Sequence, residues 1–120
     1  MLHTIIRING KKIHVLNTHL GLNHEERLKQ FQKIENYLNG LKGTPCIFMG
    51  DLNTSEPAFK NISLIDSAKI MSQEHEETLM HSKKRIDFLF VSPELKITSY
   101  EVQRVNMSDH YPVVVKMIFL

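Results

Sequence analysis

One stretch with a helical repeat most limits what this chain can fold into. Among its 120 residues, only 24–41 place apolar side chains along one face of a helix. Asn23 stands where a capping residue accepts a hydrogen bond from the first turn. Gly40, Gly43 and Pro45 predict the end of the helix. A fold with a single long helix has to build the rest of its core from strands.

The strand signals fall on both sides of that helix. Residues 2–8 and 12–18 flank Asn9 and Gly10, which predict a two-residue hairpin turn because both tolerate a positive φ. The apolar run that follows the helix predicts a short strand covered on both faces. The strands predicted after the first hairpin are residues 45–50, 86–91, 96–105 and 112–120.

Two connecting segments have no clear period. Residues 57–70 are ambiguous, and we interpret 57–62 as a helical turn. Residues 71–84 are mostly polar and predict a long, mobile loop. The expected fold class is therefore α+β, with one mainly antiparallel sheet and the long helix on one face.

Composition excludes several classes of protein. Hydrophobic residues make up 42% and charged residues 23%, which is ordinary for one soluble domain. A net charge of +2 does not favour a nucleic-acid partner by charge. Cys46 lies in an apolar run and predicts a buried free thiol. The sequence lacks a run of about 18 apolar residues, which a membrane span requires, and it shows no signal-peptide pattern. We therefore expect a cytoplasmic protein without a membrane span.

Four polar clusters lie at the ends of predicted strands. They contain His19, then Asp51 with Asn53, then Asp87, and finally Asp109 with His110. Each alone has an ordinary structural explanation, since Asp and Asn favour turns and a single histidine is usually structural.

The joint pattern indicates chemistry. Asp87 interrupts an apolar strand, and a buried carboxylate needs a partner. Oxygen ligands without cysteine suit Mg²⁺ or Mn²⁺ better than zinc. An Asp–His pair orients an imidazole and stabilises its charged form. Together, a metal, a carboxylate base and an imidazolium can hydrolyse a phosphoester.

Four motifs in a fixed order carry a resemblance to a known family. N-T-H-L, G-D-L-N-T-x-x-P, R-I-D-F-L-F-V-S and S-D-H-Y-P-V begin at residues 17, 50, 85 and 108. In this order they resemble the endonuclease/exonuclease/phosphatase superfamily of metal-dependent phosphohydrolases. The resemblance runs from about residue 5 to residue 119. It implies an α/β/β/α sandwich of two face-to-face sheets, and hydrolysis of a phosphodiester or phosphomonoester bond by an activated water.

The resemblance also implies a metal site. Asp51 would activate the attacking water or serve a second metal, and Asn53 would orient Asp51 and contact the phosphate. Asp109 would help to hold the divalent ion. The metal ligands implied on this chain are therefore Asp51, Asn53 and Asp109, and the ion is Mg²⁺ or Mn²⁺.

Three further residues receive catalytic roles from the same resemblance. His110 would donate to a phosphoryl oxygen and would be held by Asp87. His19 would be a second histidine that faces the phosphate. We expect all six polar residues to converge on one edge of a sheet, with Asp87 within hydrogen-bond reach of His110.

The resemblance implies that this chain is part of a longer domain. The four motifs belong to the C-terminal half of the family fold, and the N-terminal half normally supplies an Asn and the principal metal-binding Glu. Glu25 and Glu26 follow N-T-H-L and do not match that Glu. We therefore expect residues 1–120 to be a partial domain that binds Mg²⁺ weakly.

One face of the predicted sheet has no cover. The helix at 24–41 covers the other face, and an exposed apolar face of this size marks an interface. We expect the absent half or a second copy to pack there, with a homodimer contact made by alternating residues of 88–91 and 112–120. Two functions stay open. The first is phosphoester hydrolysis of unknown substrate class, and the second is a non-catalytic half-domain that dimerises or binds a partner.

Overall fold

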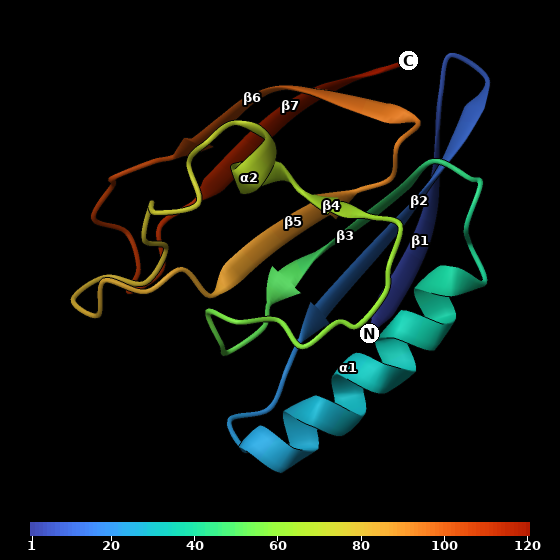
Figure 1. The fold of residues 1–120 in the computed structure, drawn as a ribbon. Coiled ribbons are helices and arrows are strands. Elements are labelled where there is room, and N and C mark those ends of the chain that lie inside the picture. The colour runs from blue at the N-terminus through green and yellow to red at the C-terminus, as the bar shows by residue number, and fades with distance from the viewer.

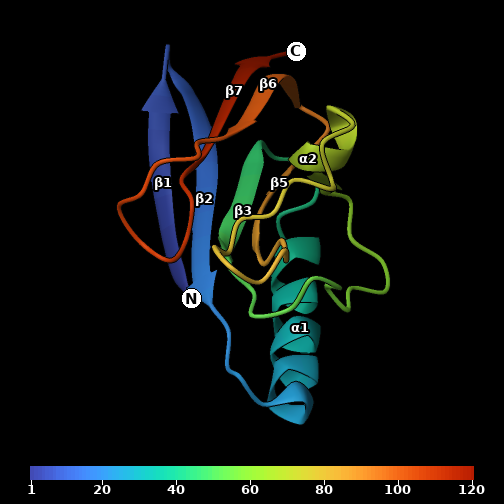
Figure 2. The same ribbon diagram turned by 90° about the vertical axis from the view of Figure 1, so that its left-hand side faces the viewer.

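The chain folds into two sheets and two helices. The computed structural model describes residues 1–120. Its elements are β1 (Leu2–Ile8), β2 (Lys11–His19), α1 (His24–Asn39), β3 (Cys46–Asp51), β4 (Ile65–Asp66), α2 (Ser67–Ile70), β5 (Asp87–Val91), β6 (Leu95–Val102) and β7 (Val113–Phe119). Five strands form a sheet in the order β1-β2-β3-β5-β4, and β6 and β7 pair separately as a ribbon. Figures 1 and 2 show α1 and the β6–β7 ribbon on opposite faces of the five-stranded sheet.

The expected α+β class with one long helix is confirmed, but the strands do not form one sheet. β5 ends at Val91, and the N–H of Leu95 donates to the carbonyl of Ser92 at 3.1 Å. Pro93 lies inside this turn and has no N–H to continue a ladder. The chain therefore leaves the plane of the sheet, and β6 runs back across one face.

The predicted hairpin and helix are both confirmed. Asn9 and Gly10 have φ angles of 52° and 78°, which is the backbone of a tight two-residue turn. β1 and β2 pair without a break from Leu2↔Asn17 to Ile8↔Lys11. The side chain of Asn23 accepts a hydrogen bond from the N–H of Glu26 and so caps α1.

A closed core lies between α1 and the five-stranded sheet. The helix contributes Phe31, Ile34 and Leu38, all buried, as the apolar stripe predicted. They pack on inward-facing residues of β2, β3 and β5, which are Leu16, Cys46, Phe48, Phe88 and Phe90. Cys46 is a buried free thiol, as expected, and its burial raises the pKa of the thiol to about 11.

Residues 57–62 do not form the helical turn that we interpreted there. The ring of Phe59 instead packs edge-on against Phe31, Phe48 and Phe90. The N–H groups of Lys60 and Asn61 donate to the carboxylate of Glu35 on α1, at 2.6 and 3.3 Å. Because these donors find a side-chain acceptor, the segment needs no helical hydrogen bonds. The only short helix nearby is α2, which follows β4.

The opposite face of the sheet is partly covered, so the expectation of a bare face is wrong. Ile13, Ile47 and Val91 of the sheet pack against Leu95 and Ile97 of β6. The residues expected to contact a second copy are used here as well, since Leu89, Val115, Met117 and Phe119 join this smaller core. The reason is the turn at residues 92–95, which folds the C-terminal strands back onto their own sheet.

The β6–β7 ribbon does not cover β1, which is an edge strand of the sheet. Side chains that are directly opposite in an antiparallel pair lie on the same face, so Ile6 shares its face with Ile13. Leu2, Ile6 and Ile8 on that face are 66%, 39% and 44% exposed. An apolar strip on β1 therefore stays in contact with solvent. None of the helices is long and apolar enough to cross a membrane.

Candidate functional site

Three polar residues lie in a row across the ends of three neighbouring strands. β2 and β3 are parallel, with His19 opposite Asp51. β3 and β5 are antiparallel, and Asp51 is opposite Asp87. The last residue of two strands and the first residue of a third therefore meet at one edge of the sheet.

Gly50 allows this row to form. Its φ is 145°, and a Cβ at this position would lie 1.8 Å from the carbonyl oxygen of Thr18. Only glycine permits β3 to approach β2 so closely. The glycine of the G-D-L-N motif is thus required by a close backbone contact, which presents the next residue, Asp51, at the sheet edge.

The predicted contact between Asp87 and His110 is confirmed. Nδ1–H of His110 donates to Oδ2 of Asp87 at 2.8 Å. The other ring nitrogen, Nε2, lies 3.7 Å from Oδ2 of Asp51. The imidazole is about one-third exposed. It therefore stands between two carboxylates and still reaches solvent.

This environment stabilises the charged form of His110. The hydrogen bond to Asp87 is the largest effect and raises the pKa of His110 above its usual value. Partial burial opposes the increase, while the negative charges of Asp87, Asp51 and Asp109 add to it. A protonated His110 can offer Nε2–H to an incoming anion while Nδ1–H stays bound to Asp87.

Asp51 is held from several sides. Its Oδ1 accepts the N–H of Asn53 at 2.9 Å, and its Oδ2 lies 3.3 Å from Nε2 of His19. Asn53 has a φ of 50°, a conformation that asparagine tolerates. The side-chain amide of Asn53 donates to the carbonyl of Leu20 at 2.6 Å. Asn53 thus orients Asp51 through its backbone and ties β3 to the end of β2 through its side chain.

Asp109 is the predicted residue that the structure does not bring into this cluster. Its carboxylate accepts the hydroxyl of Ser108 at 3.2 Å, and it is not one of the three groups whose ligand atoms lie within 4.8 Å of one another. Its backbone carbonyl accepts the N–H of Met80 at 2.7 Å. The motif that contains Asp109 is therefore anchored to the 71–84 segment, with the carboxylate on the exposed side.

A cation could be held where the carboxylates meet. Asp51, Asp87 and His110 each offer a ligand atom, and these atoms all lie within 4.8 Å of one another. Two carboxylates suit a hard divalent ion such as Mg²⁺, which completes its shell with water. One oxygen of Asp87 is already bonded to His110. While His110 is protonated and bonded to Asp87, Asp51 is therefore the member of this cluster that is left to hold a divalent ion.

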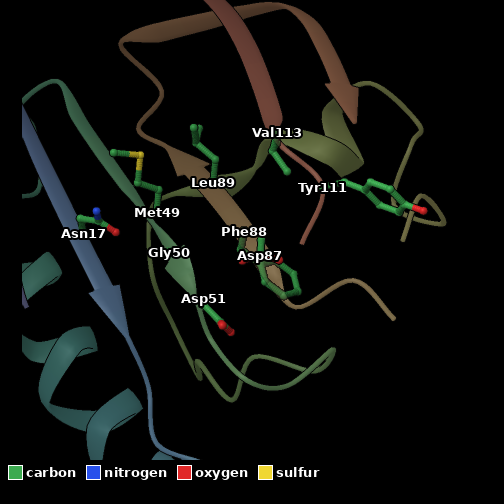
Figure 3. Close-up of a pocket in the computed structure, with 9 residues that line it drawn as sticks. All are labelled: Asn17, Met49, Gly50, Asp51, Asp87, Phe88, Leu89, Tyr111 and Val113. Carbon is green, nitrogen blue, oxygen red and sulfur yellow. The ribbon is translucent and has the colours of Figure 1, made fainter. Parts of the chain in front are cut away.

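Two hollows meet at Asp51. One of about 520 Å³ opens toward α1 and is lined by His19, Leu20, Gly21, Leu22, Glu26, Gln30, Asp51, Asn53 and His110. The other, of about 210 Å³, opens on the ribbon side (Figure 3) and is lined by Asn17, Met49, Gly50, Asp51, Asp87, Phe88, Leu89, Tyr111 and Val113. A substrate group can thus reach Asp51 from either side of the sheet edge.

Sequence reasoning missed parts of this site. Thr78 is completely buried beside Asp87, and Tyr111 lines the second hollow. The one available signal was the apolar pair Leu79-Met80 next to Thr78, inside a mostly polar segment. Arg85, at the entrance to β5, is not free to bind a substrate, because its guanidinium pairs with buried Asp66 at 2.7 Å.

Comparison with known proteins identifies the family. Residues 3–110 match the model of the endonuclease/exonuclease/phosphatase family, and the chain belongs to this family. Family membership and the Asp51–Asp87–His110 cluster support metal-dependent phosphoester hydrolysis as the chemistry of the family to which the chain belongs. A search of curated proteins finds no match.

Solved structures share the fold. The chain is similar to a mannosyl-6-phosphatase from Bacteroides thetaiotaomicron, with a TM-score of 0.75 and 22% identity, over 92% of this chain and 53% of the other. It is similar to a humanized D. rerio TDP2 (TM-score 0.76, 15% identity, 97% and 59% covered). It is also similar to the human Nocturnin catalytic domain (TM-score 0.68, 20% identity, 93% and 49% covered). The chain thus spans about half the length of these structures.

Proposed function

We propose that this chain carries the C-terminal part of the active site of a divalent-metal-dependent hydrolase, in which an activated water cleaves a phosphodiester or phosphomonoester bond. The observation that supports this most is the geometry of His110, bonded to Asp87 and 3.7 Å from Asp51. The cluster pairs a carboxylate able to act as a base with a cationic donor. That combination suits attack by water on a phosphoryl group whose negative charge grows.

Each residue has a proposed role. Asp51 accepts a proton from the attacking water, and its Oδ2 lies 3.3 Å from Nε2 of His19. Nε2–H of His110 donates to a phosphoryl oxygen, while Asp87 keeps the ring charged and oriented. His19 is 72% exposed at the rim and can meet the same phosphate. Asn53 orients Asp51.

We propose Asp51, Asn53 and Asp109 as metal ligands on this chain. A bound Mg²⁺ or Mn²⁺ would polarise phosphoryl oxygens. Since Asp109 lies outside the cluster of Asp51, Asp87 and His110, we expect weak binding by the isolated chain. A carboxylate from the rest of a longer chain or from a second copy would then strengthen the site.

The substrate is a phosphoester of a class that the site does not specify. The similar structures include a phosphatase by name, whereas a net charge of +2 does not favour nucleic acid. The substrate would bind in the two hollows that share Asp51.

Hydrolysis of p-nitrophenyl phosphate and bis(p-nitrophenyl) phosphate, with Mg²⁺ or Mn²⁺, tests this function. We expect metal-dependent release of nitrophenol that is abolished by EDTA and lowered at least 100-fold by Asp51→Asn or His110→Gln. His24→Gln is the matched control, because His24 begins α1 outside the cluster. Release that does not depend on metal, or that survives both substitutions, would contradict the proposal.

The alternative function is a non-catalytic half-domain that forms a homodimer or binds a partner. The exposed strip of Leu2, Ile6 and Ile8 and the outward residues Val114 and Ile118 of β7 support it. A third hollow, of about 370 Å³, opens between the hairpin and β7, beside Ile8 and Met117. Sedimentation velocity at micromolar concentration distinguishes a dimer of about 28 kDa, twice the 14.0 kDa chain, from a monomer. A well-folded monomer without hydrolytic activity would leave neither function supported for the isolated chain.

A further inference from the structure

Thr78 is a fully buried polar residue in a segment with little regular structure. Its relative exposure is 0%, although its neighbours in 71–84 are mostly polar and partly or fully exposed. None of the four family-like motifs contains it. A buried hydroxyl normally satisfies a particular set of hydrogen bonds, so its partners indicate its purpose.

Those partners belong to the segments that carry the site. Oγ1 of Thr78 accepts the N–H groups of Ile86 and Asp87, at 3.0 and 3.1 Å. The carbonyl of Thr78 accepts the N–H of Tyr111 at 2.8 Å, and its own N–H donates to the carbonyl of Lys84 at 2.9 Å. One residue therefore bonds to the start of β5 and to the segment that leads into β7.

The sheets alone do not fix His110 against Asp87. Asp87 begins β5, whereas His110 precedes β7, which starts only at Val113 and belongs to the separate ribbon. The strand-like bridge between Leu79 and His110 is the link next to Thr78. The 78–80 backbone therefore sets the relative position of the two side chains. Within it, Thr78 is bonded both to the start of β5, which carries Asp87, and to the segment that carries His110.

We propose that Thr78 is a positioning residue, which holds Asp87 and His110 at hydrogen-bonding distance by tying their two backbones together. Its hydroxyl fixes the N–H of Asp87 and its carbonyl fixes the N–H of Tyr111. Only the catalytic consequence rests on the proposed function. The geometric claim concerns the Asp87–His110 bond itself.

Substitutions at this position separate the hydroxyl from the shape of the side chain. Thr78→Val keeps the volume but leaves the N–H groups of Ile86 and Asp87 without an acceptor. Thr78→Ser keeps the acceptor and loses only a methyl group. Ser92→Ala is the matched control: Ser92 is also buried, and its hydroxyl accepts the N–H of Cys46 at 2.8 Å, at the far end of β5.

The readout is the imidazole Nδ1–H resonance of His110 in ¹H NMR. A proton shared with a carboxylate is shifted far downfield, and its loss in His110→Gln assigns it. We expect the resonance to be lost or moved strongly upfield in Thr78→Val, and to be retained in Thr78→Ser and in Ser92→Ala. If the chain hydrolyses phosphoesters, Thr78→Val should lower kcat roughly tenfold or more with little change in KM.

Two results would overturn the proposal. One is a folded Thr78→Val protein with an unchanged His110 resonance, and the other is an equal loss of the resonance in Ser92→Ala. If Thr78→Val does not fold, Thr78→Cys weakens the acceptor without removing it. We expect a partial upfield shift there, and an unshifted resonance would also overturn the proposal. Because the signal needs neither metal nor substrate, an inactive chain that shows the expected pattern would contradict only the proposed function.

Discussion

The two faces of the five-stranded sheet differ in how completely other elements cover them. The face toward α1 is closed by a helix and by Phe59, and its central residue Phe48 is fully buried. The opposite face is covered only in part by the β6–β7 ribbon, and Ile6 and Ile8 remain exposed beside it. The core on the α1 side is therefore closed, whereas the core on the ribbon side leaves part of the sheet in contact with solvent.

The candidate site lies where the two faces meet. Asp51 lines the hollow on the α1 side and the hollow on the ribbon side. His19 comes from the end of β2, while His110 comes from the segment that leads into the ribbon. The contact of His110 with Asp87 therefore depends on the 78–80 backbone, which is bonded to both segments.

The largest expected effect is on the closed face. Phe48→Ala should lower the free energy of unfolding by about 3–5 kcal/mol, because it leaves a cavity among packed aromatic rings. Urea denaturation followed by circular dichroism measures this loss. A loss below about 1 kcal/mol would show that the core on the α1 side is loose, and the contrast between the faces would disappear.

A smaller expected effect depends on pH. It tests the hydrogen bond between His110, which precedes the ribbon strand β7, and Asp87 of the five-stranded sheet. The pKa of His110 is raised in the folded state, chiefly by its hydrogen bond to Asp87. Its stabilising contribution is therefore fully present below the unfolded-state pKa and is lost as pH rises through the folded-state pKa. The difference in unfolding free energy between the wild type and His110→Gln should shrink across that range. A difference that grows with pH would mean that the ring is not bound to Asp87 in solution.

The smallest expected effect is on the outer face of the ribbon. Ile118 is 54% exposed, so Ile118→Ala should change the stability of a monomer by no more than about 0.5 kcal/mol. Urea denaturation at two protein concentrations measures it. A larger loss that depends on concentration would show that a second copy packs on this face, in favour of the alternative function.

Much of the fold was predictable from local patterns. The hairpin at Asn9-Gly10 and the helix capped by Asn23 follow from signals within a few residues. The division into two sheets was not predictable, since it depends on a turn after β5 that redirects β6. The helical turn interpreted at residues 57–62 was wrong for a similar reason, because the distant Glu35 on α1 accepts the N–H groups of Lys60 and Asn61.

The site was predictable to the extent that its residues stand in motifs at strand ends. The Asp87–His110 contact follows from two such motifs and is confirmed. The neighbouring apolar pair Leu79-Met80 does not identify Thr78, because its hydrogen bonds run to segments that the local pattern does not reveal. The place of Asp109 outside the cluster depends on a bond from Met80, which the sequence does not reveal either.

The most direct test of the central claim, that this sheet edge binds a metal and a phosphoryl group, is an amide NMR titration of the chain with Mg²⁺ and inorganic phosphate together. We expect weak, saturable shifts at His19, at residues 50–53, at Asp87 and at residues 108–111, all of which Asp51→Asn removes. Shifts confined to other regions, or the same shifts in Asp51→Asn, would contradict it.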